Sequence, residues 1–463
     1  MASVDRGKPR ASAPARTLFG TDGIRGRANV DPVTCETAVR LGRALVQCCG
    51  RQQRPHIVVG KDTRLSGDML ESALVAGICS AGADALLTGV LPTPGVAYLT
   101  RALKADAGVV VSASHNPFAD NGLKLFASTG YKLPDDVEAE IEQVMRDTGG
   151  ERRRPVAAAV GRIAPVAQPA TQYADFLHRT LPERCHFGGL KVVIDCAHGA
   201  ASAIGPQIFS RLGASVSAIG AAPDGTNIND GVGAMHPQRL QDAVLAQHAA
   251  LGVALDGDAD RLLCVDETGT LVDGDEILAI IAADMISRGT LRHATVVATV
   301  MSNIGLEVSL QERGARLVRV QVGDRYVVDE MVRGDCNLGG EQSGHLLLLD
   351  HTTTGDGLVA GLAVARLMTE QQRPLSVLKT VIRKFPQVLL NVPMARRTEL
   401  DTVVPVQEEV ARVQQALDGR GRVLVRASGT EPAVRVMVEG DDEARIRSYA
   451  EEIAAAIRRH VGN

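Results

Sequence analysis

Tryptophan is absent from this chain of 463 residues, and aromatic residues make up only 3% of it. Its hydrophobic cores must therefore be aliphatic. No apolar run approaches the roughly 20 residues that a membrane-spanning helix needs, which predicts a soluble protein without a membrane partner. Residues 1–16 lack the apolar stretch of a signal peptide, and their basic, Ala/Ser/Pro-rich composition predicts a disordered tail.

Neither charge sign dominates, and the cysteines form no metal-binding or redox pair. The 50 basic and 54 acidic side chains leave a net charge of -4, so the overall charge does not indicate nucleic acid as a partner. None of the eight cysteines belongs to a CxxC pair, and Cys196 and Cys264 lie in apolar runs. This pattern is typical of reduced thiols in a cytoplasmic protein.

Short apolar runs alternate with helical patterns along most of the chain, which predicts α/β units with parallel or mixed sheets. The length favours three domains or more. We predict four: three related α/β units at 17–152, 171–271 and 272–384, and a smaller α+β domain at 385–463, with a linker at 153–170. The predicted strands are 56–60, 84–88, 107–111, 191–195, 214–219, 251–255, 294–300, 316–320, 387–392, 422–425 and 433–439.

Ligands of open α/β sheets gather at the carboxyl ends of strands, so polar residues that directly follow a strand are candidate site residues. The run SASHNP follows the strand 107–111 and contains Ser114, a candidate nucleophile, beside His115. On this segment alone a strand-ending turn is the better explanation, because Asn-Pro favours turns. Adjacent side chains in an extended chain point apart, so the pair is not a hydrolase dyad.

Three carboxylates, Asp256, Asp258 and Asp260, follow the apolar strand 251–255 at alternate positions. Such close like charges repel each other, and a divalent cation relieves the repulsion. Oxygen ligands favour Mg²⁺ or Ca²⁺. An EF-hand is excluded because Arg261 stands where that loop requires glycine. A solvated acidic turn is the alternative, but the apolar strand before the cluster favours a metal site.

Three more loops carry polar groups suited to small ligands. The run GGEQSGH at 339–345 offers Glu341, Ser343 and His345 to sugar hydroxyls, although a glycine-rich hairpin explains it equally well. The run RASGTEPAVR at 426–435 resembles a phosphate cradle without a Walker motif, and a plain β-turn is its alternative. The glycine-spaced loop GTDGIRG at 20–26 contains one fixed cation, Arg25.

Together these loops resemble the α-D-phosphohexomutase superfamily, whose members place four domains around one central cleft. The likeness begins near Thr17 and covers almost the whole chain, with four motifs in the family's order. Three details resemble the bacterial branch that acts on glucosamine phosphates: LFGTDGIRG from Leu18, VGDRYV from Val322, and Gln342. Ala427 departs from the pattern, since relatives often carry another residue there.

The resemblance implies an isomerase that interconverts glucosamine 6-phosphate and glucosamine 1-phosphate through phosphorylated Ser114 and a 1,6-bisphosphate. This reaction supplies precursors of UDP-N-acetylglucosamine and of the cell wall. The implied cofactor is Mg²⁺, and the implied partners are the hexosamine phosphate, its bisphosphate and a second copy of the chain as a homodimer. The implied metal ligands are Ser114, Asp256, Asp258 and Asp260.

The resemblance also assigns the remaining site residues. Lys124 and His345 are the candidate general acids and bases, with Arg25 and His115 beside Ser114. The implied substrate-binding residues are Arg261, Arg325, Glu341, Ser343, Arg426, Ser428, Gly429, Thr430 and Arg435.

Three alternatives remain open at this point. A phosphomannomutase/phosphoglucomutase shares the same loops, although such relatives usually carry methionine at the position of Gln342. A metal-dependent phosphatase also uses Asp-x-Asp, but it has no need of a second phosphate-gripping loop. An inactive sugar-phosphate binding protein is the third, and the intact Ser114, three aspartates and Lys124 argue against it.

Overall fold

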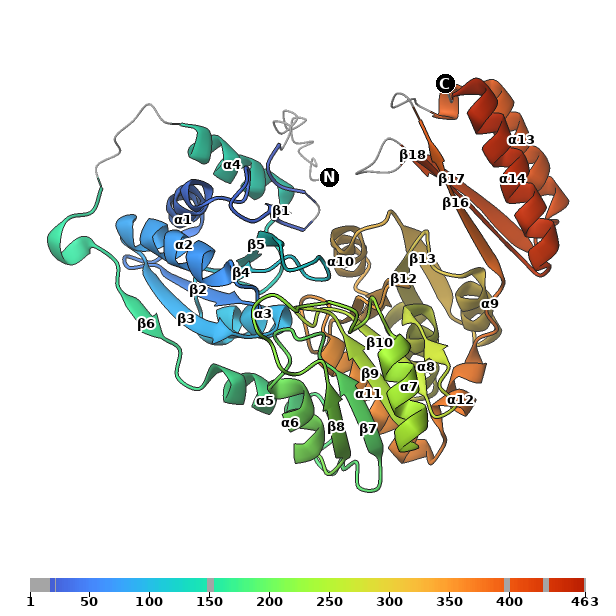
Figure 1. Cartoon of the computed structure of the whole chain (residues 1–463), viewed down its shortest axis with the longest axis horizontal. Helices are drawn as coiled ribbons and strands as arrows, with labels where there is room; N and C mark the ends of the chain where they lie inside the picture. The colour runs from blue at the N-terminus through green and yellow to red at the C-terminus, as the bar shows by residue number, and fades with distance from the viewer. Residues whose placement is uncertain (1–16, 21, 148–153, 395–399, 428–432, 462–463) are drawn as a thin grey trace, which may run out of the picture.

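The computed structural model describes residues 17–20, 22–147, 154–394, 400–427 and 433–461. The predicted disordered tail, residues 1–16, lies outside this part, as do Ser428, Gly429 and Thr430 of the predicted phosphate loop. The strands of the described part form four sheets, each built from a consecutive stretch of the chain (Figure 1). The predicted fold class is therefore confirmed: three α/β units precede a smaller C-terminal unit.

The first sheet has the order β1-β5-β4-β2-β3-β6 and the second β11-β10-β9-β7-β8. The first contains β1 (Ile24–Arg27), β2 (His56–Lys61), β3 (Asp84–Val90), β4 (Ala107–Val111), β5 (Asp120–Ala127) and β6 (Ile163–Pro165). The second contains β7 (Lys191–Asp195), β8 (Ser215–Ile219), β9 (Leu251–Leu255), β10 (Leu262–Asp266) and β11 (Leu271–Val272). The segment predicted as a linker thus contributes β6, which pairs parallel with β3.

The third sheet has the order β13-β12-β14-β15, and the fourth is an antiparallel β16-β18-β17 sheet. The third contains β12 (Thr295–Thr299), β13 (Arg316–Val320), β14 (Leu338–Gly340) and β15 (Leu346–Leu348). The fourth contains β16 (Gln387–Pro393), β17 (Gly421–Ala427) and β18 (Ala433–Gly440).

The first three sheets share one plan that no sequence repeat reveals. In each, a central strand (β2, β7 or β12) has a parallel neighbour on both sides, and the strand that follows the second neighbour returns antiparallel beside it. The three return loops are 112–119, 256–261 and 341–345. Ser114, the three aspartates and the Glu341–His345 run therefore occupy equivalent positions in three units.

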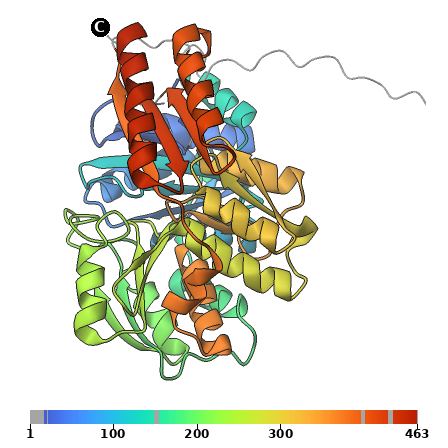
Figure 2. The same cartoon turned by 90° about the vertical axis from the view of Figure 1, so that its right-hand side faces the viewer.

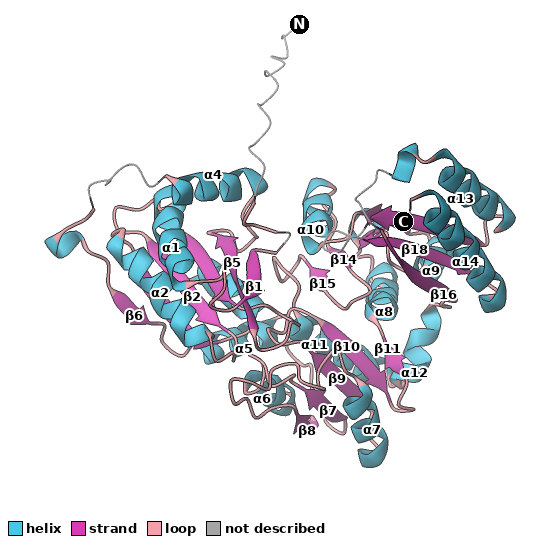
Figure 3. Cartoon of the chain, turned by 45° about the horizontal axis from the view of Figure 1, so that its top comes forward, coloured by secondary structure: helices cyan, strands magenta, loops and turns pink. Residues whose placement is uncertain are grey.

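Helices cover both faces of the sheet in the first unit (Figure 3). The helices of the first three units are α1 (Cys35–Cys49), α2 (Gly67–Ser80), α3 (Thr93–Ala102), α4 (Asp135–Arg146), α5 (Pro169–Arg179), α6 (Ile204–Arg211), α7 (Gln238–Gln247), α8 (Gly274–Ser287), α9 (Ile304–Glu312), α10 (Asp324–Arg333), α11 (Gly357–Gln371) and α12 (Leu375–Leu378). Short 3-10 turns lie at Ala157–Ala159, Arg292–Ala294, Lys379–Val381 and Leu400–Thr402.

One hydrophobic core runs through the first three units and holds their loops in a common frame. A second core lies between the first sheet and the helices α1 and α2, and strand β2 divides the two cores. Val58 belongs to the shared core, whereas Ile57 and Val59, on the opposite face of β2, belong to the second core with α1 and α2. Helix α11 is buried along most of its length and packs on both the second sheet and α8. A helix that is apolar on all sides requires this kind of central position.

The fourth unit has its own core, and α13 (Val404–Ala416) and α14 (Glu443–His460) lie side by side over one face of its sheet (Figure 2). All eight cysteines are free thiols, as predicted. No helix in the described part of the chain is long and apolar enough to span a membrane.

Candidate active site

Ser114 lies in the loop between β4 and β5, and its side chain points at the second unit. Its Oγ donates a 2.5 Å hydrogen bond to Asp256 Oδ2, a residue 142 positions later in the chain. The backbone of Ser114 is left-handed, with φ of 51°, which is unusual for a residue other than glycine. His115 Nδ1 lies 3.4 Å from the same Oγ. Burial, then the nearby Arg261 and Arg25, lower the pKa of His115 to about 4, so it is neutral at pH 7.

The three aspartates converge as the sequence predicts. Asp256, Asp258 and Asp260 are all buried, and each offers a carboxylate oxygen within 4.8 Å of the others. The left-handed Ala259, with φ of 58°, turns the loop so that alternate side chains meet. Burial and the two neighbouring carboxylates raise the pKa of Asp256 to about 8.

The donor set fits a divalent cation. Asp258 Oδ1 and Asp260 Oδ1 are buried, and neither has a hydrogen-bond partner among the described residues. A buried carboxylate oxygen without a hydrogen bond carries a large desolvation penalty. Together with Asp256 and the Ser114 oxygen, these atoms form an all-oxygen cluster of the kind that hard cations prefer. The chain therefore contains a site that can bind a metal.

Lys124, on β5 of the first unit, reaches the aspartates of the second unit. Its Nζ lies 2.7 Å from Asp258 Oδ2 and 3.1 Å from Asp260 Oδ2, and the side chain is almost completely buried. Burial lowers the pKa of Lys124, but Asp22, Asp258 and Asp260 outweigh it and hold the pKa well above the ordinary value. The ammonium group therefore carries its proton at neutral pH.

His345, in the return loop of the third unit, lies between Asp260 of the aspartate loop (256–261) and Asp324 at the start of α10. Its Nδ1 lies 3.7 Å from Asp260 Oδ1, and its Nε2 lies 3.5 Å from Asp324 Oδ2. Burial lowers the pKa of His345, yet the contacts with Asp260 and Asp324 leave it raised overall.

Sequence reasoning missed three residues of this network. Lys132 bridges Asp22 in the first unit and Asp324 at the start of α10, and Asp22 also lies 3.1 Å from Lys124 Nζ. Asp22 and Asp324 fall inside the motifs GTDGIRG and VGDRYV, which was the available signal. Lys132 has no comparable signal, because it follows an ordinary glycine turn.

Three of the predicted substrate-binding residues, Glu341, Ser343 and Arg261, lie in the return loops around this centre. Glu341 accepts hydrogen bonds from Gly323 N at 3.0 Å and from Ser343 Oγ at 3.2 Å, which fixes the loop 341–345. Arg261 lies beside the aspartates, with Nε 4.0 Å from Asp260 Oδ1. Arg325 instead donates to both carboxylate oxygens of Glu138 on α4, at 2.8 and 3.0 Å. Arg25, on β1, pairs with Asp22.

Arg426 on β17 and Arg435 on β18 are directly opposite each other in the fourth sheet. Like charges at such positions destabilise a sheet unless an anion lies between them. Burial and the neighbouring Arg435 lower the pKa of Arg426, and its buried Nε has no hydrogen-bond partner among the described residues. The pair is therefore suited to a phosphate group.

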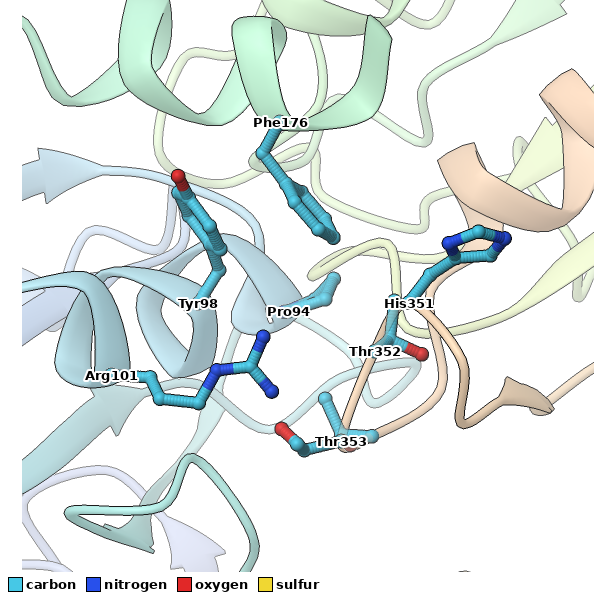
Figure 4. A pocket seen from close by; sticks show the side chains of 8 residues that line it. Pro94, Tyr98, Arg101, Phe176, His351, Thr352 and Thr353 are labelled. Carbon is cyan, nitrogen blue, oxygen red and sulfur yellow. The ribbon is translucent and has the colours of Figure 1, made fainter. Parts of the chain in front are cut away.

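Two cavities lie where the third unit meets the units that precede it in the chain. One of about 560 Å³ borders Lys132 and Asp324 and continues along α10 to Val332. The other is only about 10 Å³, large enough for a single water molecule, and lies between α3, α5 and residues 351–354 (Figure 4). There Tyr98 and Phe176, whose rings stack on each other, line the cavity together with Thr352, Thr353 and Thr354 of the third unit. This second cavity is too small for a sugar.

Comparison with known families accounts for almost the whole chain. Four models of the phosphoglucomutase/phosphomannomutase family match in order: α/β/α domain I at 16–151, domain II at 171–269, domain III at 273–385 and the C-terminal domain at 389–456. The phosphoglucosamine mutase of Syntrophotalea carbinolica is 50% identical over 449 residues, which cover 96% of this chain and 98% of the relative. The chain belongs to the phosphoglucosamine mutase family.

Other members of the phosphoglucosamine mutase family show the same level of similarity. The protein from an Anaeromyxobacter species is 51% identical over 453 residues, 97% of each chain. Among solved structures, a phosphoglucomutase/phosphomannomutase family protein from Burkholderia thailandensis has a TM-score of 0.80 at 24% identity, covering 96% of this chain and 97% of that one. The N-acetylphosphoglucosamine mutase of Aspergillus fumigatus, solved with GlcNAc-6P and magnesium, has a TM-score of 0.67 at 17% identity, covering 98% and 97%. These two structures share the fold.

Proposed function

We propose that this chain interconverts glucosamine 6-phosphate and glucosamine 1-phosphate, with Ser114 carrying the phosphoryl group. The observation that supports this best is the Ser114–Asp256 hydrogen bond, which places a buried hydroxyl directly on the three-aspartate cluster. His115, whose Nδ1 lies 3.4 Å from the same hydroxyl, is a weak base because its pKa is lowered to about 4.

The cofactor we propose is Mg²⁺, held by Asp256, Asp258, Asp260 and a phosphate oxygen on Ser114. When bound, it supplies positive charge that stabilises the transferring phosphoryl group. Phosphoryl transfer depends mainly on positioning and charge neutralisation, so the rest of the site has to orient the sugar and move one proton.

Lys124 is the proposed carrier of that proton. It is charged, buried and within hydrogen-bond distance of Asp258 and Asp260, so its Nζ lies at the edge of the phosphoryl site. In one direction Lys124 gives its proton to the departing Ser114 oxygen and recovers one from the sugar hydroxyl that attacks the phosphorus. In the other direction it protonates the departing sugar oxygen and recovers a proton from Ser114 Oγ. His345, hydrogen-bonded by Gly355 N at 3.2 Å, is the second group that can serve the sugar hydroxyl.

The sugar and its second phosphate are held further out. Glu341 and Ser343 offer acceptors and donors to the ring hydroxyls, and Arg426 with Arg435 grips the phosphate that is not reacting. The bisphosphate intermediate must turn round so that each phosphate reaches Ser114. The A. fumigatus relatives were solved with GlcNAc-6P and with glucose 1,6-bisphosphate, ligands of the chemistry proposed here.

A substrate panel tests the reaction. With Mg²⁺ and a trace of the sugar bisphosphate, we expect kcat/KM for glucosamine 6-phosphate to exceed that for glucose and mannose 6-phosphates. Each rate is measured as formation of the 1-phosphate. Faster turnover of the glucose or mannose compound would identify a phosphoglucomutase/phosphomannomutase instead, and release of inorganic phosphate without any 1-phosphate would identify a phosphatase.

The role of the opposed arginines is tested by Arg435→Gln. Loss of a hydrogen bond to a charged group costs about 1.5–3 kcal/mol, so we expect KM for the sugar phosphate to rise on the order of 10- to 100-fold. The rate at which Ser114 is phosphorylated by saturating bisphosphate should change much less. Arg412→Gln is the matched control, because Arg412 lies in the same unit but pairs with Glu409 on the exposed face of α13. An unchanged KM in Arg435→Gln would contradict the assignment.

A further inference from the structure

A buried arginine outside the groups that react organises the loop carrying Ser114. Arg64 follows β2 and, like its partner Asp62, has no exposed side-chain surface. A guanidinium has five N–H groups, and each of those of Arg64 has an acceptor. Nε donates to Asp62 Oδ2 at 2.8 Å, while Nη1 and Nη2 donate to backbone carbonyl oxygens. Those four carbonyls belong to Ser114, Asn116, Pro117 and Asp120.

The Arg64–Asp62 ion pair also fixes the backbone N–H group of Ser114, through the side chain of Ser112. Asp62 Oδ2 accepts a 2.6 Å hydrogen bond from Ser112 Oγ, and Ser112 Oγ in turn accepts one of 2.9 Å from Ser114 N. The backbone N–H of Ser114 is thus fixed through Asp62, and its carbonyl is fixed through Arg64. Both backbone groups that define the left-handed conformation of Ser114 are anchored to one buried ion pair.

A second donor reaches the loop from the second unit. Asn229 Nδ2 donates to the Ser114 carbonyl at 2.9 Å and to the Asn116 carbonyl at 3.0 Å. The metal loop passes against the same point: a Cβ at Gly257 would lie 2.6 Å from the Ser114 carbonyl oxygen. The Ser114 carbonyl therefore accepts hydrogen bonds from Arg64 in the first unit and from Asn229 in the second. These contacts connect the loop that carries Ser114 (the serine loop, 112–119) to the loop that carries the three aspartates (the aspartate loop, 256–261).

This arrangement has an electrostatic consequence for an anion carried on Ser114. Carbonyl oxygens are the negative ends of peptide dipoles, and four of them would repel a phosphoryl group if they faced it. Their hydrogen bonds to Arg64 turn them toward a buried cation instead. The left-handed Ser114 then projects Oγ at Asp256, 2.5 Å away. A non-glycine residue keeps such a conformation only where its surroundings impose it.

We propose that Arg64 and Asn229 are positioning residues for phosphoryl transfer, which hold the Ser114 carbonyl so that Oγ stays aligned with the aspartate cluster. The inference rests on the proposed function, since it concerns the same serine. It predicts that weakening these contacts slows the chemistry at Ser114 without weakening the grip on the sugar phosphate, because the arginines of the fourth unit make that grip.

The test compares Arg64→Lys, Asn229→Ala and the wild-type full chain with Mg²⁺. A lysine keeps the charge beside Asp62 but has three N–H groups, so it cannot reach all four carbonyls. We expect kcat to fall on the order of 100-fold, the loss that a displacement of about 1 Å produces, with KM changed by less than about threefold. The rate of Ser114 phosphorylation by glucose 1,6-bisphosphate, followed by intact mass, should fall in parallel.

Arg366→Lys is the matched control, because Arg366 bridges Asp284 and Glu370 in the third unit, away from the serine loop. It should lose thermal stability without losing kcat. If Arg64→Lys does not fold, Asn229→Ala decides the matter, since it deletes only two hydrogen bonds. Folded variants that phosphorylate Ser114 at the wild-type rate would overturn the inference, as would an equal loss of kcat in Arg366→Lys. Failure of wild-type Ser114 to accept a phosphoryl group would instead remove the proposed function itself.

Discussion

Replacing Ser114 with alanine should abolish mutase turnover while leaving the fold intact. The change removes the only oxygen that we place as phosphoryl carrier, and losses on the order of 10⁴-fold or more are typical when a covalent nucleophile is deleted. The folded chain should lose only about 1 kcal/mol, because the hydroxyl makes one strong hydrogen bond, to Asp256. Turnover of glucosamine 6-phosphate and thermal unfolding measure the two effects.

Ser309→Ala provides the comparison for this experiment. Ser309 is also buried and donates one hydrogen bond, to the carbonyl of Val381, but it lies in α9 outside the site. It should show a similar small loss of stability with full activity. Phosphopeptide mapping should place the phosphoryl group of the wild-type protein on Ser114. Full activity in Ser114→Ala, or a phosphate on another residue, would contradict the mechanism.

Asp256→Asn should remove most of the activity without destabilising the metal-free protein. Burial and the carboxylates of Asp260 and Asp258 raise the pKa of Asp256 from 3.8 to about 8. A raised carboxyl pKa contributes stability below pH 3.8 that is lost as pH rises through about 8, so at pH 7 the metal-free wild type has already lost much of it. Asparagine lacks this ionisation, and its amide can donate to Ser114 Oγ while its oxygen accepts from Arg261 N.

The measurable signature of Asp256→Asn is its response to Mg²⁺. Ligand binding stabilises a folded protein by about 2.7 kcal/mol at 100 times Kd, so the thermal midpoint of the wild type should rise with Mg²⁺. The variant should show little rise, and its kcat should fall by at least on the order of 100-fold, since even indirect partners of a metal change affinity 10- to 100-fold.

The matched control for this second prediction is Asp275→Asn. Asp275 is also buried, its pKa is raised to about 7, and its Oδ2 accepts from Asn303 N outside the aspartate cluster. This variant should keep both activity and the response to Mg²⁺. An Asp256→Asn protein that responds to Mg²⁺ like the wild type would contradict the metal assignment.

Much of the local structure was predictable because strands and helices leave a repeating pattern. The strands β4, β7, β9 and β13 match their predicted bounds, and the other seven strands of the predicted set differ by one or two residues at an end. The strands β1, β5, β6, β11, β14 and β15 were not predicted. The predicted boundaries of the four domains stay predictions. The predicted roles of Lys124, His345 and the substrate-binding residues likewise stay predictions, although the structure brings Lys124 and His345 to the aspartates.

The sequence did not predict side-chain contacts between residues that lie far apart in the chain. Lys132 follows a turn and carries no motif, yet it contacts Asp22, 110 residues earlier, and Asp324, 192 residues later. Arg64 looks like an ordinary surface arginine after a strand, yet it is buried and holds four carbonyls of another loop. Side-chain chemistry alone does not reveal such partners, because a charged residue is buried only when the fold delivers its acceptors.

The chain's own pattern determined where the strands end and which polar groups follow them: the loop with Ser114, the loop with the three aspartates, the loop 341–345 and the predicted phosphate loop at 426–435. Only the tertiary structure decided that three of these loops are equivalent returns in three copies of one plan, and that Ser114 meets Asp256 across 142 residues. The physical reason is that hydrophobic periodicity is local, extending over one strand or helix, whereas a buried charge network depends on how separate sheets pack. Shared burial of the aliphatic core around α11 sets that packing, and with it the site.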